Sequence, residues 1–165
     1  MRRGRISVEK LLTDLAADPV FTAAEQERER KRLASASECA EEDGAIAAEA
    51  RQLGLNVTSV WDFVNNTGLA FLGHTFVGPY QSAYPLLIKH LAIKHDPRIR
   101  EGVIRALTVK DGGPEVAEAL LNEFRAERSP ALRWVLANAL RTAMPYAQRR
   151  RFPEIQRAYK SAGRE

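Results

Sequence analysis

The stretch YPLLIKHLAIKHDPRIREGVIRAL, residues 84–107, is followed by a second version of itself, AEALLNEFRAERSPALRWVLANAL, residues 117–140. The two segments align without gaps at an offset of 33 residues, and apolar residues recur in the same places. The identical pairs are Leu87/Leu120, Pro97/Pro130, Arg100/Arg133, Ala106/Ala139 and Leu107/Leu140. A repeat of this length predicts a pair of helices that stacks against its own copy, as in an α-solenoid. Folds of this kind mostly bind other molecules.

Each copy predicts two helices joined at a proline. The four expected helices cover residues 82–94, 97–108, 114–126 and 130–143. Asp96 precedes Pro97 as an N-cap, and Pro97 takes the first helical position, where its missing N–H has no helical partner to lose. Ser129 and Pro130 repeat that arrangement in the second copy. Residues 144–165 depart from the repeat and are expected to form a C-terminal helical cap.

Residues 1–66 predict further helices. A short helix is expected at 7–17. Residues 21–53 are rich in helix-forming and charged side chains, and they predict one long helix or two with a break at Gly44. Gly54 is expected to end this element as a C-cap.

Residues 56–66 predict a short helix that starts with Ser59 and Asp62 in the spacing of a capping box. Trp61 is interpreted as a packing residue rather than a platform for nucleic-acid bases, because a tryptophan buries a large area. The glycine-rich, apolar stretch 67–80 separates this helix from the repeats. It either packs at the edge of the core or forms an apolar binding loop.

The bulk composition is that of one folded domain over residues 1–165. Hydrophobic residues make up 45% of the chain, which suits a core rather than disorder. A single cysteine, Cys39, excludes an intramolecular disulfide and suits a reducing compartment. The N-terminal segment lacks the apolar core of a signal peptide, and no stretch approaches the ~20 apolar residues of a membrane span. We therefore expect a cytoplasmic, all-α protein.

Positive charge is concentrated in the repeat half. The net charge is +4, but residues 1–84 carry 9 Lys and Arg against 12 Asp and Glu, which gives −3. Residues 85–165 carry 16 against 9, which gives +7. A field of this sign favours an acidic protein partner or nucleic acid, although a solvated helical surface has the same composition.

The segment KHDPRIREGVIRAL resembles the second half of a HEAT repeat, in which Asp-Pro-x-(Val/Ile)-Arg is followed by small residues and a leucine. The first copy matches at Asp96, Pro97, Ile99, Arg100, Ala106 and Leu107, and the second at Ser129, Pro130, Leu132, Arg133, Ala139 and Leu140. The second copy lacks the aspartate, so an Asp–Arg ladder is not expected there. Across residues 20–140 the order of motifs is similar to small bacterial HEAT-like proteins of unassigned function. The resemblance implies an interaction protein built as a short α-solenoid and brings no catalytic residues with it.

The sequence contains no motif for catalysis or for a bound group. His74, His90 and His95 form no metal-binding motif. His90 and His95 straddle the end of the expected helix 82–94, so they are not expected to share a helix face. The stretch Gly112-Gly113-Pro114 is interpreted as a helix connector rather than a phosphate loop. We therefore expect no catalytic residue, no metal site and no cofactor.

Helical spacing separates two faces in the second helix of each repeat. In helix 97–108 the expected core face carries Ile99, Val103, Ala106 and Leu107. The opposite face carries Arg98, Glu101, Arg105 and Thr108. The offset of 33 residues places on the equivalent face of the next copy Ala131, Trp134, Asn138 and Arg141.

Trp and Arg are enriched in binding hot spots, so this face is the expected partner site. The candidate binding residues are Glu101, Arg105, Trp134, Asn138 and Arg141, with a basic rim of Arg149, Arg150 and Arg151. The competing interpretation is that the C-terminal segment 145–160 covers Trp134, because its own apolar side chains need a surface to pack on.

The leading hypothesis is a non-enzymatic module, either an adaptor or an immunity or inhibitor protein, that binds another protein through this face. The alternative is nucleic-acid binding through the basic C-terminal half. A third hypothesis is a HEAT-like DNA glycosylase, which would need Trp61, Asp62 and Trp134 to converge on a flipped base. Homodimerisation through the long N-terminal helix stays open.

Overall fold

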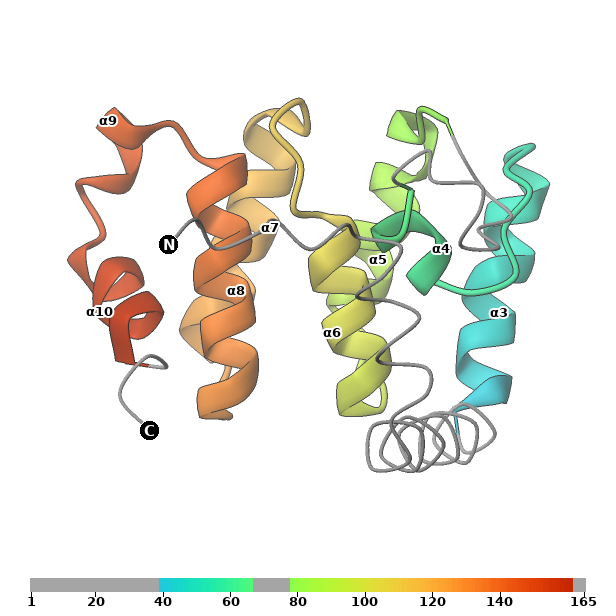
Figure 1. Cartoon of the computed structure of the whole chain (residues 1–165), viewed down its shortest axis with the longest axis horizontal. Coiled ribbons are helices and arrows are strands. Elements are labelled where there is room, and N and C mark those ends of the chain that lie inside the picture. Colours follow the sequence, from blue (N-terminus) through green and yellow to red (C-terminus); the bar gives the residue numbers. More distant parts are fainter. Residues whose placement is uncertain (1–38, 67–77, 162–165) are drawn as a thin grey trace, which may run out of the picture. The chain divides into compact units, whose positions relative to one another are not determined.

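The computed structural model of the chain describes residues 39–66 and 78–161 (Figure 1). Within these ranges every regular element is a helix and none is a strand, which confirms the all-α class. No helix of the described part is both long and apolar enough to cross a membrane. The chain divides into two compact units, Met1–Ala40 and Glu41–Glu165. The expected helix 7–17, the first part of 21–53 and most of the stretch 67–80 lie outside the described residues.

The predicted helices of the repeats are present with small shifts at their ends. The elements are α3 Ala40–Gln52, α4 Trp61–Val64, the 3-10 turn η2 Gln81–Ala83, α5 Tyr84–Leu91, α6 Pro97–Ala106, α7 Gly113–Ala126, α8 Pro130–Ala143, α9 Tyr146–Arg149 and α10 Pro153–Ser161. Gly44 lies inside α3, so the alternative with a helix break there is wrong. Gly54 has φ +81° and its N–H bonds the carbonyl of Arg51, as expected of a residue that ends a helix.

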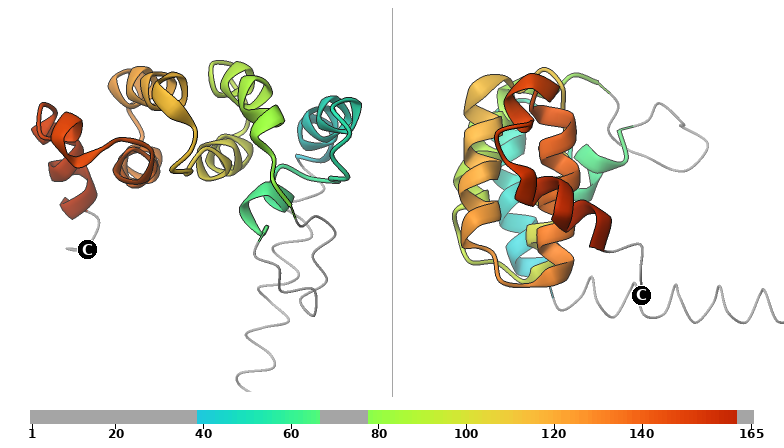
Figure 2. Two further views of the ribbon diagram at one scale, coloured as in Figure 1. Left: turned by 90° about the horizontal axis from the view of Figure 1, so that it is seen from above. Right: turned by 90° about the vertical axis from the view of Figure 1, so that its left-hand side faces the viewer.

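The two copies of the repeat form two helix pairs that pack against each other. Helix α5 packs on α6 and α7, and α8 packs on α6 and α7. Figure 2 shows α5 and α7 in one row and α6 and α8 in the other. Equivalent positions of both copies fill the space between the rows: Leu87 and Leu120, Leu91 and Phe124, Ile99 and Leu132, Val103 and Leu136, Ala106 and Ala139, and Leu107 and Leu140 are all buried. The apolar register read from the sequence is therefore the register of the core.

The starts of α6 and α8 differ in their side-chain bonds. Asp96 is the predicted N-cap of α6, and its side chain accepts a hydrogen bond from the N–H of Arg98 at 2.9 Å. Ser129 occupies the predicted N-cap position of α8, but its side chain makes no cap bond. The buried Glu127 carboxylate instead holds the backbone just before α8, since its Oε1 accepts from the N–H groups of Arg128 and Ser129, both at 2.8 Å.

Helix α4 packs closely on α6 at Gly102. A Cβ at Gly102 would lie 2.6 Å from Val60 Cγ1 and 3.3 Å from Trp61 Cε2. Asp43 of α3 holds the same turn from the other side, because its carboxylate accepts from the Ser59 hydroxyl at 2.6 Å and from the Val60 N–H at 2.7 Å. The predicted reciprocal bond of the capping box is confirmed, since Asp62 Oδ2 accepts from the Ser59 N–H at 3.1 Å.

Arg100 joins the two helix pairs through an ion pair that is largely shielded from water. Its Nη1 lies 2.7 Å from Glu127 Oε2, and its Nη2 lies 2.9 Å from Glu123 Oε2. The exposed fractions of the side chains are 19% for Arg100 and 8% for Glu127. Burial raises the pKa of the Glu127 carboxyl, but the N–H groups of Ser129 and Arg128 and the charge of Arg100 together outweigh it and hold that pKa below its ordinary value.

Gly102→Ala is expected to destabilise the protein by about 1–3 kcal/mol, because the new methyl group overlaps the buried side chain of Val60. Urea unfolding measures the change. Gly44→Ala is the matched control, since a Cβ there meets no atom within 4 Å. In that helix interior alanine is expected to be neutral or stabilising by up to about 1 kcal/mol. Equal effects of both substitutions would contradict the close α4–α6 contact.

Arg100→Met is expected to cost about 3 kcal/mol of unfolding free energy, because it leaves the Glu127 carboxylate buried without its cation. Glu127→Gln in the same chain should recover part of that loss. Arg98→Met, at a side chain that is 40% exposed, should stay within about 1 kcal/mol.

The same pair predicts the direction of the acid response. A carboxyl whose pKa is lowered on folding contributes stability above its unfolded value, 4.5 for Glu127, and loses it as pH falls through the folded value. Chemical unfolding at a series of pH values should therefore show this loss below about pH 4.5 in the wild type and a smaller loss in Arg100→Met.

Candidate functional site

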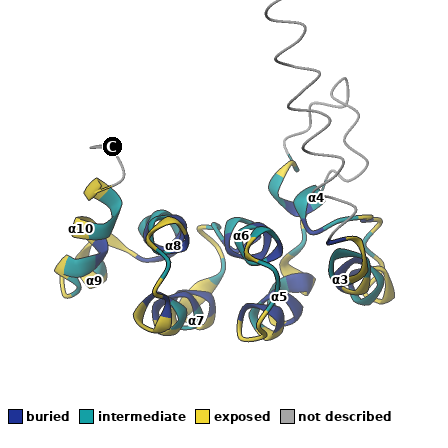
Figure 3. Cartoon of the chain, turned by 90° about the horizontal axis from the view of Figure 1, so that it is seen from below, coloured by how far each residue is buried: buried dark blue, intermediate teal, exposed yellow. Residues whose placement is uncertain are grey.

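The five candidate binding residues lie together on the second row of helices. Glu101 and Arg105 are on α6, and Trp134, Asn138 and Arg141 are on α8, which packs beside α6. All five are half-buried. Figure 3 shows such half-buried residues on the side of α6 and α8 that faces away from α5 and α7. The predicted face therefore exists as a polar, partly accessible surface.

Arg105 and Glu101 of this surface are already paired with each other. Arg105 Nε donates to Glu101 Oε1 at 2.7 Å, one helical turn away. Both side chains are about one third exposed, at 36% and 33%. The charge of Arg105 is thus partly neutralised within α6, and a partner would have to compete with Glu101 for it.

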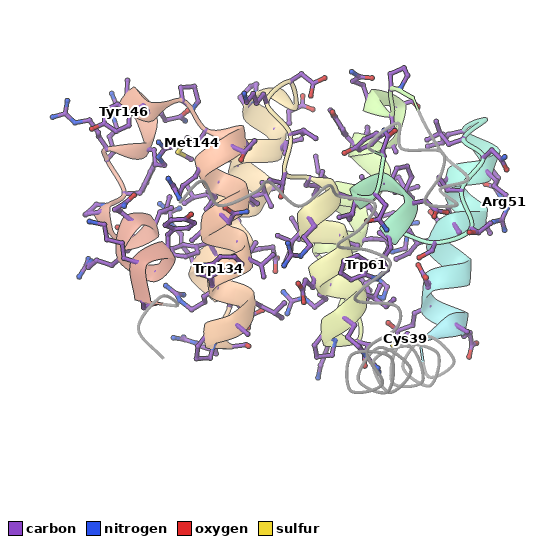
Figure 4. The ribbon with its side chains drawn as sticks, viewed as in Figure 1. Cys39, Arg51, Trp61, Trp134, Met144 and Tyr146 are labelled. Atoms are coloured by element: carbon purple, nitrogen blue, oxygen red, sulfur yellow. The ribbon has the colours of Figure 1, made fainter. Side chains whose placement is uncertain are left out.

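Trp134 is stacked by the C-terminal helix, as one of the two sequence interpretations proposed. The Tyr159 ring of α10 lies nearly parallel to the indole, with a centroid distance of 6.1 Å and an interplanar angle of 14°. The Arg141 guanidinium lies over the same Tyr159 ring at 3.6 Å. Figure 4 shows Trp134 on the side of α8 that faces α10. Trp134 keeps some accessible surface but is not a free anchor.

The basic rim divides into one structural residue and two exposed ones. The Arg149 guanidinium donates to the carbonyl oxygens of Arg141 at 2.5 Å and of Met144 at 3.3 Å, at the end of α8. A cation in this position stabilises a helix C-terminus. Arg150 and Arg151 are exposed. Only these two remain available as a rim that a partner could reach.

The residues required by the glycosylase hypothesis are occupied elsewhere. Trp61 packs beside Gly102, as Figure 4 shows for α4 and α6. The Asp62 carboxylate accepts from the Thr58 N–H at 2.7 Å, the Thr58 hydroxyl at 3.0 Å and the Ser59 N–H at 3.1 Å. Its role is therefore to close the turn before α4, and this arrangement gives the glycosylase hypothesis no support.

A hollow of about 490 Å³ lies between the start of α8 and helix α10. Its lining residues are Pro130, Arg133, Glu154, Arg157, Ala158 and Ser161. Arg133 is committed to the fold here, since its Nη1 donates to the carbonyls of Phe124 at 2.8 Å and Glu127 at 3.0 Å. Its guanidinium also lies 4.3 Å from the centre of the Phe124 ring.

Sequence reasoning missed a cluster around His90 and His95. The two rings are in contact, with His90 Nδ1 3.0 Å from His95 Nε2, although they do not share a helix face. The chain turns back after α5 and brings the rings together. Glu49 and Glu42 of α3 lie at the outer nitrogens. The glutamates lie 41 and 53 residues before the histidines that they contact, so no local motif indicates the cluster. The described residues contain no group of three or more ligands that could hold a metal ion.

Asp111 forms a second cluster, between η2, α5 and the loop before α7. Its carboxylate accepts from Gln81 Nε2 at 2.7 Å and from the Tyr84 hydroxyl at 2.8 Å. These two hydrogen bonds, Gln81 first, lower the pKa of Asp111. Burial and then the Asp111 contact raise the pKa of the Tyr84 hydroxyl. A hydroxyl held protonated in this way is a hydrogen-bond donor that fastens the start of α5, not a nucleophile.

Comparison with known proteins adds no further constraint. No family matches the chain, and no curated protein or solved structure was found to be similar to it. The function must therefore be argued from the surface itself.

Tyr159→Ala is expected to expose the Trp134 indole and to cost about 1–2 kcal/mol, the sum of an aromatic stack and a cation–π contact. Tryptophan emission should shift to the red and become more accessible to acrylamide, preferably in a Trp61→Phe background so that Trp134 alone is observed. Tyr146→Ala is the control, because Tyr146 is 69% exposed. An unchanged emission in Tyr159→Ala would contradict the stack.

Proposed function

We propose that residues 81–143 form two HEAT-like helical hairpins of a short α-solenoid that binds another protein and catalyses no reaction. Support comes from the two helix pairs packed in two rows, with equivalent residues of both copies buried between them. Elements outside the repeat flank the pairs, since α4 packs on α6 and α10 packs on α8. Such stacks present an extended row of second helices to a partner.

The observation that carries the proposal is the half-buried polar surface of α6 and α8. It combines the Arg105–Glu101 pair with the Trp134, Tyr159 and Arg141 stack. Aromatic rings held rigidly beside arginines bind partners at a low cost in side-chain entropy. The stack therefore replaces a free Trp134 as the expected anchor.

The charge of this half of the chain favours an acidic partner. Residues 85–165 carry a net charge of +7, and Arg150 and Arg151 are exposed next to the surface-forming helices. An adaptor, or an immunity or inhibitor protein that covers an acidic active site, fits this chemistry. With a single cysteine in the chain, we propose the cytoplasm as its compartment. Homodimerisation through the long N-terminal helix is a separate hypothesis, because the first part of the expected helix 21–53 lies outside the described residues.

The test is recovery of a partner by the purified protein from cell extract, compared across three charge-reversal variants. Arg105→Glu and Arg141→Glu should each reduce recovery of the same partner at least tenfold, because each reverses a charge on the proposed surface. Arg128→Glu, at an exposed position of the α7–α8 loop, should leave recovery unchanged. Circular dichroism of each variant confirms that the helices are retained. A partner recovered equally by all three would exclude this surface.

Nucleic-acid binding is the second candidate, and the exposed basic side chains of the C-terminal helices favour it. Arg150, Arg151, Arg157 and Lys160 are all exposed. If they neutralise phosphates, the affinity for duplex DNA or RNA should fall steeply between about 50 and 200 mM salt, because each neutralised phosphate releases bound counterions. No binding at the lower salt concentration would exclude this candidate and leave the protein partner.

A further inference from the structure

A continuous chain of polar contacts links α3 to the first helix pair. Glu49 Oε1 lies 3.3 Å from His90 Nε2, and His90 Nδ1 lies 3.0 Å from His95 Nε2. His95 Nδ1 then lies 3.0 Å from Glu42 Oε2. The histidine side chains are shielded from water, with exposed fractions of 6% and 10%. Both ends of this series of contacts are carboxylates, so each end can only accept a hydrogen bond.

Counting protons shows which charge state satisfies all three contacts. The carboxylates of Glu49 and Glu42 each require an N–H on the ring nitrogen that faces them. The contact between the rings requires one more N–H, because two lone pairs or two N–H groups cannot face each other at 3.0 Å. Three protons on two imidazoles leave one ring neutral and make the other a cation. Two neutral rings leave one contact unmade, and two cations oppose two N–H groups.

The surroundings place the shared charge on His95. Burial is the main cause that lowers the pKa of the His90 ring, and the neighbouring His95 and Lys89 charges lower it further, against the opposing effect of Glu49. His90 is therefore the neutral ring, with its proton on Nε2 toward Glu49. His95 then donates from both nitrogens, to Glu42 and to His90.

We infer that His90 and His95 hold one shared proton and, with Glu42 and Glu49, form a pH-sensitive clasp that fastens α3 to α5 and to the start of α6. The clasp contains no residue of the proposed partner surface. It attaches α3 to the first helix pair.

The groups around the clasp come from each adjoining element. From α5, Lys89 Nζ lies 2.7 Å from Glu49 Oε2. From the start of α6, the Asp96 N–H donates to Glu42 Oε2 at 2.9 Å, and the Asp96 carboxylate pairs with Arg98 at 3.1 Å. Glu42 thus accepts from a ring and from the backbone of the loop, so loss of the positive charge of His95 weakens the contact between α3 and that loop.

The clasp responds to pH in two ways, and the two responses have opposite signs. Below the ordinary histidine pKa of about 6.5, the unfolded chain protonates His90 more readily than the folded chain does, so stability falls as pH falls. When the shared proton leaves as pH rises, the N–H between the rings is lost and the His95–Glu42 ion pair becomes a neutral hydrogen bond, so α3 is held less tightly.

The direct test is the proton count on the two rings, measured by nitrogen-15 NMR of histidine-labelled protein from about pH 5 to about pH 8.5. While the shared proton is held, His90 should show one protonated nitrogen, Nε2, and His95 should show two. The ratio of the amide exchange rate in α3 to that in α7 of the same sample should rise about fivefold once the shared proton has left. This is the effect of losing one net hydrogen bond. Two neutral rings throughout, or two independent titrations, would overturn the clasp.

Glu42→Gln tests the charge without removing the acceptor. Its amide oxygen still accepts from His95 and from Asp96, but the shared proton should be lost at a lower pH than in the wild type. Glu41→Gln is the matched control, an exposed residue of the same first turn of α3, and it should leave the titration in place. If both variants titrate as the wild type does, the carboxylate at position 42 does not stabilise the shared proton on the histidine rings, and the clasp is wrong.

Discussion

Arg100 provides the contact on which the arrangement of the two helix pairs depends. Its guanidinium reaches from α6 to Glu123 and Glu127 at the far end of α7, so one side chain sets the spacing between consecutive pairs. The cost of burying these charges is offset because Glu127 also accepts hydrogen bonds from two backbone N–H groups. Removal of one member of such a shielded pair leaves the other charge buried without its counterion, which is strongly destabilising. Arg133, the equivalent residue of the second copy, bonds carbonyl groups of its own pair instead, beside α10.

The elements outside the repeat decide how much of the second row of helices is accessible. Helix α4 rests on α6 at Gly102, where only a glycine leaves room for Val60 and Trp61. Helix α10 covers Trp134 with Tyr159 and buries Ile155 completely. The surface left between them is narrower than helical periodicity suggests, and its aromatic component is a stack of α8 and α10 rather than one tryptophan. A partner would meet a preformed, cationic and aromatic surface.

At the other end of the repeats, α3 adds polar contacts to its buried apolar residues Ile46, Ala47 and Ala50. Asp43, Glu42 and Glu49 of α3 bond the turn before α4, the loop before α6 and helix α5. In the sequence, these three acidic side chains of one charged helix are typical of a solvated surface. Their partners are brought to them from 16 to 54 residues away, which is why charge patterning within one helix could not identify them.

The sequence by itself determined the all-α class, the approximate limits of the repeated helices, the Asp96 cap and the buried register. Each of these follows from local propensity and from an apolar periodicity that occurs in both copies of the repeat. It also placed Glu101, Arg105, Trp134, Asn138 and Arg141 on adjoining helices of one row. Only the tertiary structure decided that Glu127 bonds the backbone before α8, that Tyr159 stacks on Trp134, and that His90 meets His95 between two carboxylates. These contacts join side chains from different elements or across a turn of the loop, and their geometry depends on how the helices pack and on how the chain turns between them, neither of which a helical period specifies.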